Sequence, residues 1–230
     1  MKKITLAILM TFGIFTMVSA DIGVKLGVSA QIGSMETSGK ETNSDGVTAS
    51  SKSDTEEALF GTAGFFIEKD LAFLPGPFGR LSIGFDNIAH DIDFGTQRNP
   101  RRASLGAAGA VVAASEHSVN AKMTGFETLY ATLNITDWLY VKGGSVTVDV
   151  DTKFIGSSTS TYPTSHSLDG SVIGFGVEKS SDNGMFFRLE YNDYSIDGKS
   201  VANTGTDSKF TAHLNDVSGS TGRISIGKAF

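Results

Sequence analysis

The chain has 230 residues, with 19 basic and 25 acidic side chains and no cysteine. The formal net charge of −6 disfavours nucleic-acid binding, which depends on basic patches. The lack of cysteine excludes disulfide stabilisation, thiol catalysis and cysteine-based metal sites.

The N-terminus has the layout of a secretory signal peptide. Residues 1–3 are short and positively charged, residues 4–18 are almost unbroken apolar sequence, and Val18-Ser19-Ala20 offers small side chains before Asp21. The apolar run is shorter than the roughly 20 residues that a spanning helix needs, which favours cleavage over a membrane anchor. We expect a cleaved signal peptide at 1–20 and one mature domain at 21–230. Without Lys2 and Lys3, the mature domain has 17 basic and 25 acidic side chains, a net charge of −8.

Strict alternation of apolar and polar residues predicts strands throughout the mature chain. In residues 21–33, every even position is apolar and every odd position is polar or glycine. Seven further segments have the same period of two. They are residues 58–69, 80–90, 122–135, 138–150, 170–179, 185–196 and about 216–230. In the fifth of these eight segments the apolar residues change from odd to even positions near Gly143 and Gly144, which predicts a β-bulge there.

The connections between these segments are sorted by length. Residues 34–57, 91–121, 151–169 and 197–215 are long, whereas residues 70–79, 136–137 and 181–184 are short. In an antiparallel order, all long connections fall at one end and all short ones at the other. This asymmetry is typical of a membrane barrel with long outer loops and short turns. Within the second long connection, the small-residue run from Ala103 to Ala114 is compatible with a helix, a strand extension or a loop.

Charged residues lie on one face of the predicted strands, and apolar residues lie on the other. A soluble barrel would bury the apolar face, whereas a membrane barrel turns it outward to lipid and encloses the polar face. We favour the membrane barrel, whose narrow interior would force the charges to pair. The predicted interior network consists of Lys25, Glu68, Arg80, Asp86, Lys142, Glu178, Arg188, Glu190 and Arg223.

The last strand carries a family resemblance. Ile224, Ile226 and Phe230 share one face, and the sequence ends on an aromatic residue. This pattern resembles the C-terminal signal of bacterial outer-membrane β-barrels, which is read by the barrel-assembly machinery during insertion. Lys228 falls on the same face, close enough to the end to extend its amine to the membrane interface.

With the export signal and the sorted loops, the mature chain resembles the small eight-stranded barrels of the OmpA-domain, OmpX and OmpW type. The resemblance implies an all-β fold, an eight-stranded antiparallel up-and-down transmembrane β-barrel with long extracellular loops and short periplasmic turns. It also implies residence in the bacterial outer membrane, among lipid and lipopolysaccharide. No peptidoglycan-binding domain follows the last strand, so we do not expect a cell-wall tether.

Aromatic residues gather at the two ends of the predicted barrel, as in the girdles that mark membrane interfaces. The group at the short-turn end contains Phe73, Phe78, Trp138, Phe187 and Phe230, and the group toward the long loops contains Phe94, Phe126, Tyr191 and Tyr194.

The long loops hold the residues that could carry chemistry. His90, Asp91 and Asp93 could form a catalytic or metal site, but no nucleophile motif accompanies them. Asp149 and Asp151 could join Asp91 and Asp93 in holding a divalent cation near lipopolysaccharide, and solvated loop charge is the simpler explanation. Solvation is also the simpler explanation for three arginines that could contact lipid phosphates. They are Arg98, Arg101 and Arg102.

We therefore expect no enzyme activity, no catalytic residues, no cofactor and no metal. The sequence leaves two functions open. One is a structural, surface-interaction or envelope-integrity role with a lumen plugged by charged side chains, in which the loops contact an extracellular ligand. The other is a small porin-like channel for ions or small solutes.

Overall fold

A computed structural model of the chain describes residues 22–43, 55–101, 104–105, 111–112, 115–155, 162–204 and 210–230. The predicted signal peptide at 1–20 lies outside these residues. Within the described residues there is no helix long and apolar enough to cross a membrane.

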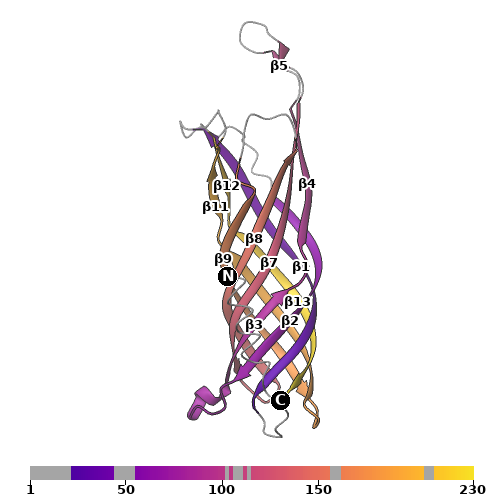
Figure 1. Cartoon of the computed structure of the whole chain (residues 1–230), viewed down its shortest axis with the longest axis vertical. Coiled ribbons are helices and arrows are strands. Elements are labelled where there is room, and N and C mark those ends of the chain that lie inside the picture. Colours follow the sequence, from indigo (N-terminus) through magenta and orange to yellow (C-terminus); the bar gives the residue numbers. More distant parts are fainter. Residues whose placement is uncertain are drawn as a thin grey trace.

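The described chain forms a closed antiparallel barrel with eight strand positions in its wall (Figure 1). In order around the wall, the strands are β1 (Val24–Asn43), β2 (Thr55–Asp70), β3 (Leu81–Ile88) continued by β4 (Ile92–Arg101), β7 (Ser115–Asn134), β8 (Leu139–Ile155), β9 (Ser165–Ser180), β10 (Met185–Ile196) and β13 (Val217–Ala229). The eight predicted strands and the up-and-down order are therefore confirmed.

The first and last strands close the barrel. β1 pairs with β13 from Lys25↔Ala229 to Glu36↔Ser218, and it pairs with β2 along its other edge. At the short-turn end, Val24 and Phe230 exchange backbone hydrogen bonds of 3.2 and 2.8 Å. Closure satisfies the edge groups of both strands, which an open sheet would leave unpaired.

The outer wall carries a belt of exposed apolar side chains in its short-turn half. On β1 the outward residues from Leu26 to Ile32 span six residue steps, about 20 Å along the strand and roughly 15 Å in height at the usual tilt, which is more than half of the roughly 25 Å apolar band of a membrane barrel. Ile32 is 73% exposed and Leu59 82% exposed, so the belt has no protein cover. The other large members of the belt include Val28, Phe65, Ile83, Leu129, Val141, Ile173, Phe175, Leu189, Ile224 and Ile226.

In the loop-side half, the polarity of the wall is reversed, with apolar side chains inside and polar side chains outside. Val148 on β8 is fully buried, whereas its neighbours Thr147 and Asp149 are partly or fully exposed on the outer surface. The apolar side chains packed in this half are Met35, Ile88, Ile92, Met123, Phe126, Val146, Val148, Val150, Leu168, Val172, Tyr194, Ile196 and Val217. This part of the barrel has the core of a water-soluble protein.

The reversal corrects the predicted bulge at Gly143 and Gly144. β8 pairs with β9 in unbroken register from Leu139↔Val177 to Asp151↔Ser165, so it contains no slip. The apolar set moves to even positions because the apolar face changes from outside to inside. The irregularity lies on the neighbouring strand, where β7 shifts register between Thr124 and Glu127, and Gly125 there has a φ of +59°.

The strands also extend well into the segments predicted as loops. β1 runs to Asn43 and β2 starts at Thr55, so much of the first long loop is strand. β11 (Lys199–Ala202) and β12 (Phe210–Leu214) form a hairpin beyond β10 and β13, and β12 pairs with the end of β1. In the run from Ala103 to Ala114, β5 (Ser104–Leu105) and β6 (Val111–Val112) pair with each other, and the remaining residues lie outside the described ones.

The short connections are tight, as predicted. Residues 181–184 form a hairpin turn closed by hydrogen bonds from Ser181 N–H to the carbonyl of Met185 and from Gly184 N–H to the carbonyl of Ser181. Between β7 and β8, the hydroxyl of Thr136 accepts the N–H of Leu139 at 2.9 Å. The β2–β3 turn contains the single-turn helix η1 (Gly76–Arg80), which buries no side chain.

Candidate functional site

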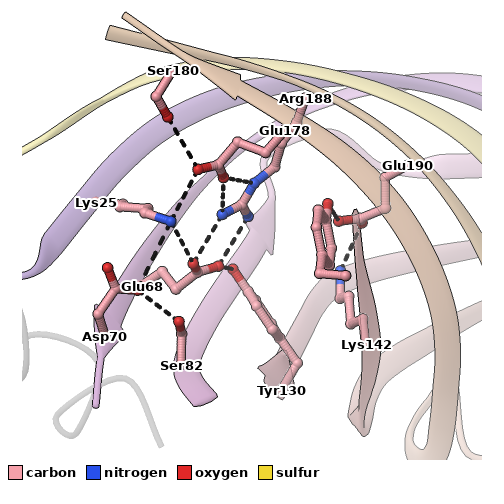
Figure 2. A network of polar contacts seen from close by, with 11 residues as sticks. Lys25, Glu68, Asp70, Ser82, Tyr130, Lys142, Glu178, Ser180, Arg188 and Glu190 are labelled. Carbon is pink, nitrogen blue, oxygen red and sulfur yellow. Dashed lines mark hydrogen bonds and ion pairs between the residues drawn. The ribbon is translucent and has the colours of Figure 1, made fainter. Parts of the chain in front are cut away.

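The short-turn half of the barrel interior holds a network of ion pairs centred on Arg188 of β10 (Figure 2). The two terminal nitrogens of Arg188 donate to the two oxygens of Glu68 on β2 at 2.9 and 2.8 Å. Its Nε donates to Glu178 on β9 at 2.7 Å. Lys25 on β1 lies 3.0 Å from the same Glu178 carboxylate and 3.7 Å from Glu68. Four strands are thus connected across the lumen.

Aromatic side chains enclose the same guanidinium group. The Cζ of Arg188 lies 5.2 Å from the ring centre of Phe66, 5.3 Å from that of Phe186 and 5.1 Å from that of Tyr140. Cation–π attraction of this kind is stronger where water is excluded, and Arg188 is only 3% exposed. The rings therefore fill the space around the ion pairs and hold the guanidinium in place.

A second network lies beside the first and is centred on Glu190 of β10. Lys142 donates to Glu190 at 2.9 Å, Tyr140 at 2.7 Å and Asn192 at 2.8 Å. Arg223 lies 3.8 Å from this carboxylate and makes a two-pronged ion pair with Asp86. Since residues on β3, β8, β10 and β13 take part, this network also spans the lumen.

The two networks are electrically balanced. Among the described interior residues, the carboxylates are Glu68, Asp86, Glu178 and Glu190, and the cations are Lys25, Lys142, Arg188 and Arg223. Each buried charge thus has an opposite charge in hydrogen-bonding contact, as burial requires. Toward the short-turn opening, the more exposed Asp70 accepts a hydrogen bond from Ser82 at 2.6 Å and lies 3.8 Å from Lys25.

The structure brings together every member of the predicted interior network except Arg80. Arg80 ends the η1 turn, where it is exposed and donates to the carbonyl of Ile135 at 3.2 Å. The alternation of the sequence predicted that Arg80 points inward. The strand begins only at Leu81, so Arg80 does not take part in the alternation of side chains along it. The prediction for Arg80 is therefore wrong.

The predicted girdle residues divide into two groups. Five are exposed on the outer surface, namely Phe73, Phe78, Trp138, Phe187 and Tyr191, and Phe230 is exposed at the end of the chain. Phe126 and Tyr194 are not girdle residues, because they are buried inside the loop-side core with ring centres 5.5 Å apart. Phe94 packs against that core.

The closing strand presents Ile224, Ile226 and Phe230 on the outer wall, each about half exposed. Lys228 is exposed on the same face, and its amine lies 5.4 Å from the ring centre of Phe230. The role of this face as an insertion signal stays a prediction.

Sequence reasoning missed the uncharged partners of the networks. Tyr130 donates to Glu68 at 3.2 Å, and its ring centre lies 4.4 Å from the amine of Lys142. Tyr140 and Asn192 complete the contacts of Glu190. Tyr140 shares the inward parity of Lys142 on β8, and Asn192 shares that of Glu190 on β10, whereas the inward neighbours of Tyr130 on β7 are uncharged threonines. For Tyr140 and Asn192, that parity was the available signal.

The loop-side histidines and aspartates form no metal cluster among the described residues. Asp93 accepts the N–H of Gly95 at 2.7 Å and an amide hydrogen of Asn120 at 3.2 Å, and it lies 3.5 Å from Lys122. The N–H of Gly95 is the main reason that the pKa of Asp93 is lowered. These contacts tie β4 to β7. The side chains of Arg98, Arg101 and Arg102 lie outside the described part of the chain.

Comparison with solved structures identifies the architecture. The outer membrane protease OmpT from Escherichia coli aligns with a TM-score of 0.50 and 10% identity over 94% of this chain and 99% of that one. This is the fold of a bacterial outer-membrane β-barrel. OprG from Pseudomonas aeruginosa (TM-score 0.45, 9% identity, 93% and 99% covered) and Neisserial surface protein A (0.42, 10%, 90% and 97%) are also similar. No family model and no curated protein matches the sequence.

The outer-membrane fold and the apolar belt agree with each other. The belt has the polarity that lipid requires, and the interior holds the charges that lipid would exclude. The chain thus combines the fold of an outer-membrane β-barrel with an outer wall suited to lipid.

Proposed function

We propose that this barrel is a sealed outer-membrane protein that anchors and displays its loops and does not conduct solutes. The observation that carries this proposal is the presence of two different seals in series along the lumen. The ion-pair networks fill the short-turn half, and the apolar core fills the loop-side half.

The first seal closes the lumen by cross-linking opposite walls. The interior of an eight-stranded barrel is only wide enough for side chains to fill it. Arg188 and Glu190 point into this space and contact residues on strands from around the wall. An ion that entered would have to displace hydrogen-bonded charges, and each displaced charge would be left without a partner.

The second seal is a barrier of another kind. The side chains packed with Val148 and Ile196, both 0% exposed, are predominantly hydrocarbon, and in this cluster the Tyr194 hydroxyl is the single oxygen that could replace part of the hydration shell of an ion. Hydrophobic constrictions of this kind exclude water and therefore ions. A rearrangement of the ion pairs alone would leave this barrier in place.

We further propose that the barrel has no enzyme activity. His90 and Asp91 are exposed at the loop side, and the Asp93 carboxylate is occupied by Gly95, Asn120 and Lys122. The protease activity of OmpT belongs to that protein. The partners that suit a sealed barrel are the lipid and lipopolysaccharide around it, the assembly machinery during insertion, and an extracellular ligand at the loops.

Conductance across a planar bilayer tests the proposal. We expect no steady current from the purified wild-type barrel, with a porin of known conductance as the positive control. The double variant Glu68→Ser/Arg188→Ser removes the centre of the first seal, and we expect it to remain silent because the apolar core is intact. Large, regular channels in the wild-type protein would overturn the sealed-barrel proposal and favour the porin-like alternative.

A further inference from the structure

A groove crosses the outer wall in the loop-side part of the apolar belt. It has a volume of about 560 Å³ and lies over β9, β10, β13 and β1. Its outward-facing lining is apolar and includes Ala30, Ile32, Phe175, Tyr191, Gly222 and Ile224. Glu190 and Arg223 belong to the same stretch of wall, and their buried side chains lie on its inner face.

Gly222 forms the floor of the groove. It pairs with Tyr191 on β10 and with Ile32 on β1, so both large side chains project from the same row of the outer face. A Cβ added at Gly222 would meet no atom within 4 Å. With strands about 4.8 Å apart, the two flanking side chains rise from backbones about 10 Å apart. The gap in the belt is therefore as wide as the one side chain that glycine lacks.

The width and chemistry of the groove fit one hydrocarbon chain. Carbon atoms pack at about 3.5–4.0 Å, so a single chain lying over Gly222 touches both walls, and two chains do not fit. The next outward position on β13 is Ser220, and its cross-strand partners are Asp193 and Ser34. The groove thus runs from the apolar belt to a polar surface. A lipid could place its acyl chain over the apolar part and its headgroup beside the polar part.

The position of the groove within the apolar belt indicates which molecule fills it. The groove is continuous with a surface that already faces lipid, and it lies in the half of the belt nearer the loops. A second barrel has a convex wall, which would rest on Ile32 and Tyr191 without reaching Gly222. We infer that the groove is a binding site for one acyl chain of an outer-leaflet lipid.

Native mass spectrometry of the refolded barrel with dipalmitoyl phosphatidylethanolamine tests this inference. We expect one retained lipid per barrel, and no retention of glycerophosphoethanolamine, which has the headgroup without the chains. Gly222→Leu fills the groove and should reduce retention about tenfold, the effect of displacing roughly two methylene groups. Gly143→Leu is the matched control, because Gly143 is also outward-facing and open, with no atom nearer than 4.0 Å to an added Cβ.

Folding is checked by the mobility of unheated samples on an SDS gel. If Gly222→Leu fails to fold, Ala30→Leu fills the same groove from β1. The inference is overturned if the folded groove variant retains lipid like the wild type, or if the wild type retains none. It is also overturned if Gly222→Cys, in a chain without other cysteines, cross-links two barrels efficiently in membranes. This test does not measure conductance, so its result neither supports nor contradicts the sealed-barrel proposal.

Discussion

Replacing Arg188 with methionine tests whether the interior charges act as one unit. The substitution keeps most of the side-chain volume and removes three charge-assisted hydrogen bonds, two to Glu68 and one to Glu178. The interior would then hold four carboxylates against three cations. Lys25 alone cannot pair both acids at close range, since it lies 3.0 Å from Glu178 and 3.7 Å from Glu68.

The expected loss in the free energy of unfolding is about 3–5 kcal/mol, the usual effect of removing one partner of a buried ion pair. Glu68 is 1% exposed, so water cannot replace the lost guanidinium. Adding Glu68→Gln to Arg188→Met restores equal numbers of charges, and this double variant should regain about 2 kcal/mol. Arg80→Met is the matched control, with an expected loss below about 1 kcal/mol because Arg80 is exposed.

Urea unfolding of the refolded barrel in lipid vesicles measures these differences, with the fluorescence of the single tryptophan as the signal. The reasoning is refuted if Arg188→Met costs no more than Arg80→Met. It is also refuted if Glu68→Gln makes the Arg188→Met variant less stable instead of more stable, because the two charges would then not depend on each other.

Three further predictions concern the loop-side half. Val148→Asp places a carboxylate in the dry core and should cost several kcal/mol, so that no heat-modifiable folded species appears on an SDS gel. Gly125→Ala should cost about 1–2 kcal/mol in urea unfolding because its φ is +59°, whereas Gly61→Ala, which is open and outward-facing, should not. The pKa of Asp93 is lowered chiefly by the N–H of Gly95, so its contribution to stability is present above the ordinary value of 3.8 and is lost as the pH falls below it. The Asp93→Asn variant should lack that part of the acid dependence, measured as the unfolding midpoint against pH.

The period of two predicted the strands and most of the interior charges, but it could not show which face is inside. Alternation identifies residues that share a face, and the surroundings decide which face is buried. On β8, the apolar residues pass from outward Val141 to inward Val146 with no break in register. A bulge and a change of surroundings from lipid to water give the same sequence pattern. β10 behaves likewise, with Tyr191 outward and Tyr194 inward.

Which interior side chains pair with each other could not be predicted, for a different reason. Tyr130 and Tyr140 have aromatic rings that suit lipid, core and interface equally well. Their roles depend on which strands face each other across the lumen, and this is set by the closure of the barrel. The contact between Arg188 and Glu68 joins residues 120 positions apart. Such contacts depend on the stagger of the strands, which no local pattern encodes.

The loop-side core also determines how far the protein reaches. β1 continues for nine residue steps from Ser34 to Asn43, which at the usual strand tilt adds about 20 Å of height above the apolar belt. Figure 1 shows β4 and β12 in the same extension. Because the apolar core that includes Met35 and Val148 packs at the base of this extension, the described strands continue above the lipid headgroups as a stiff wall.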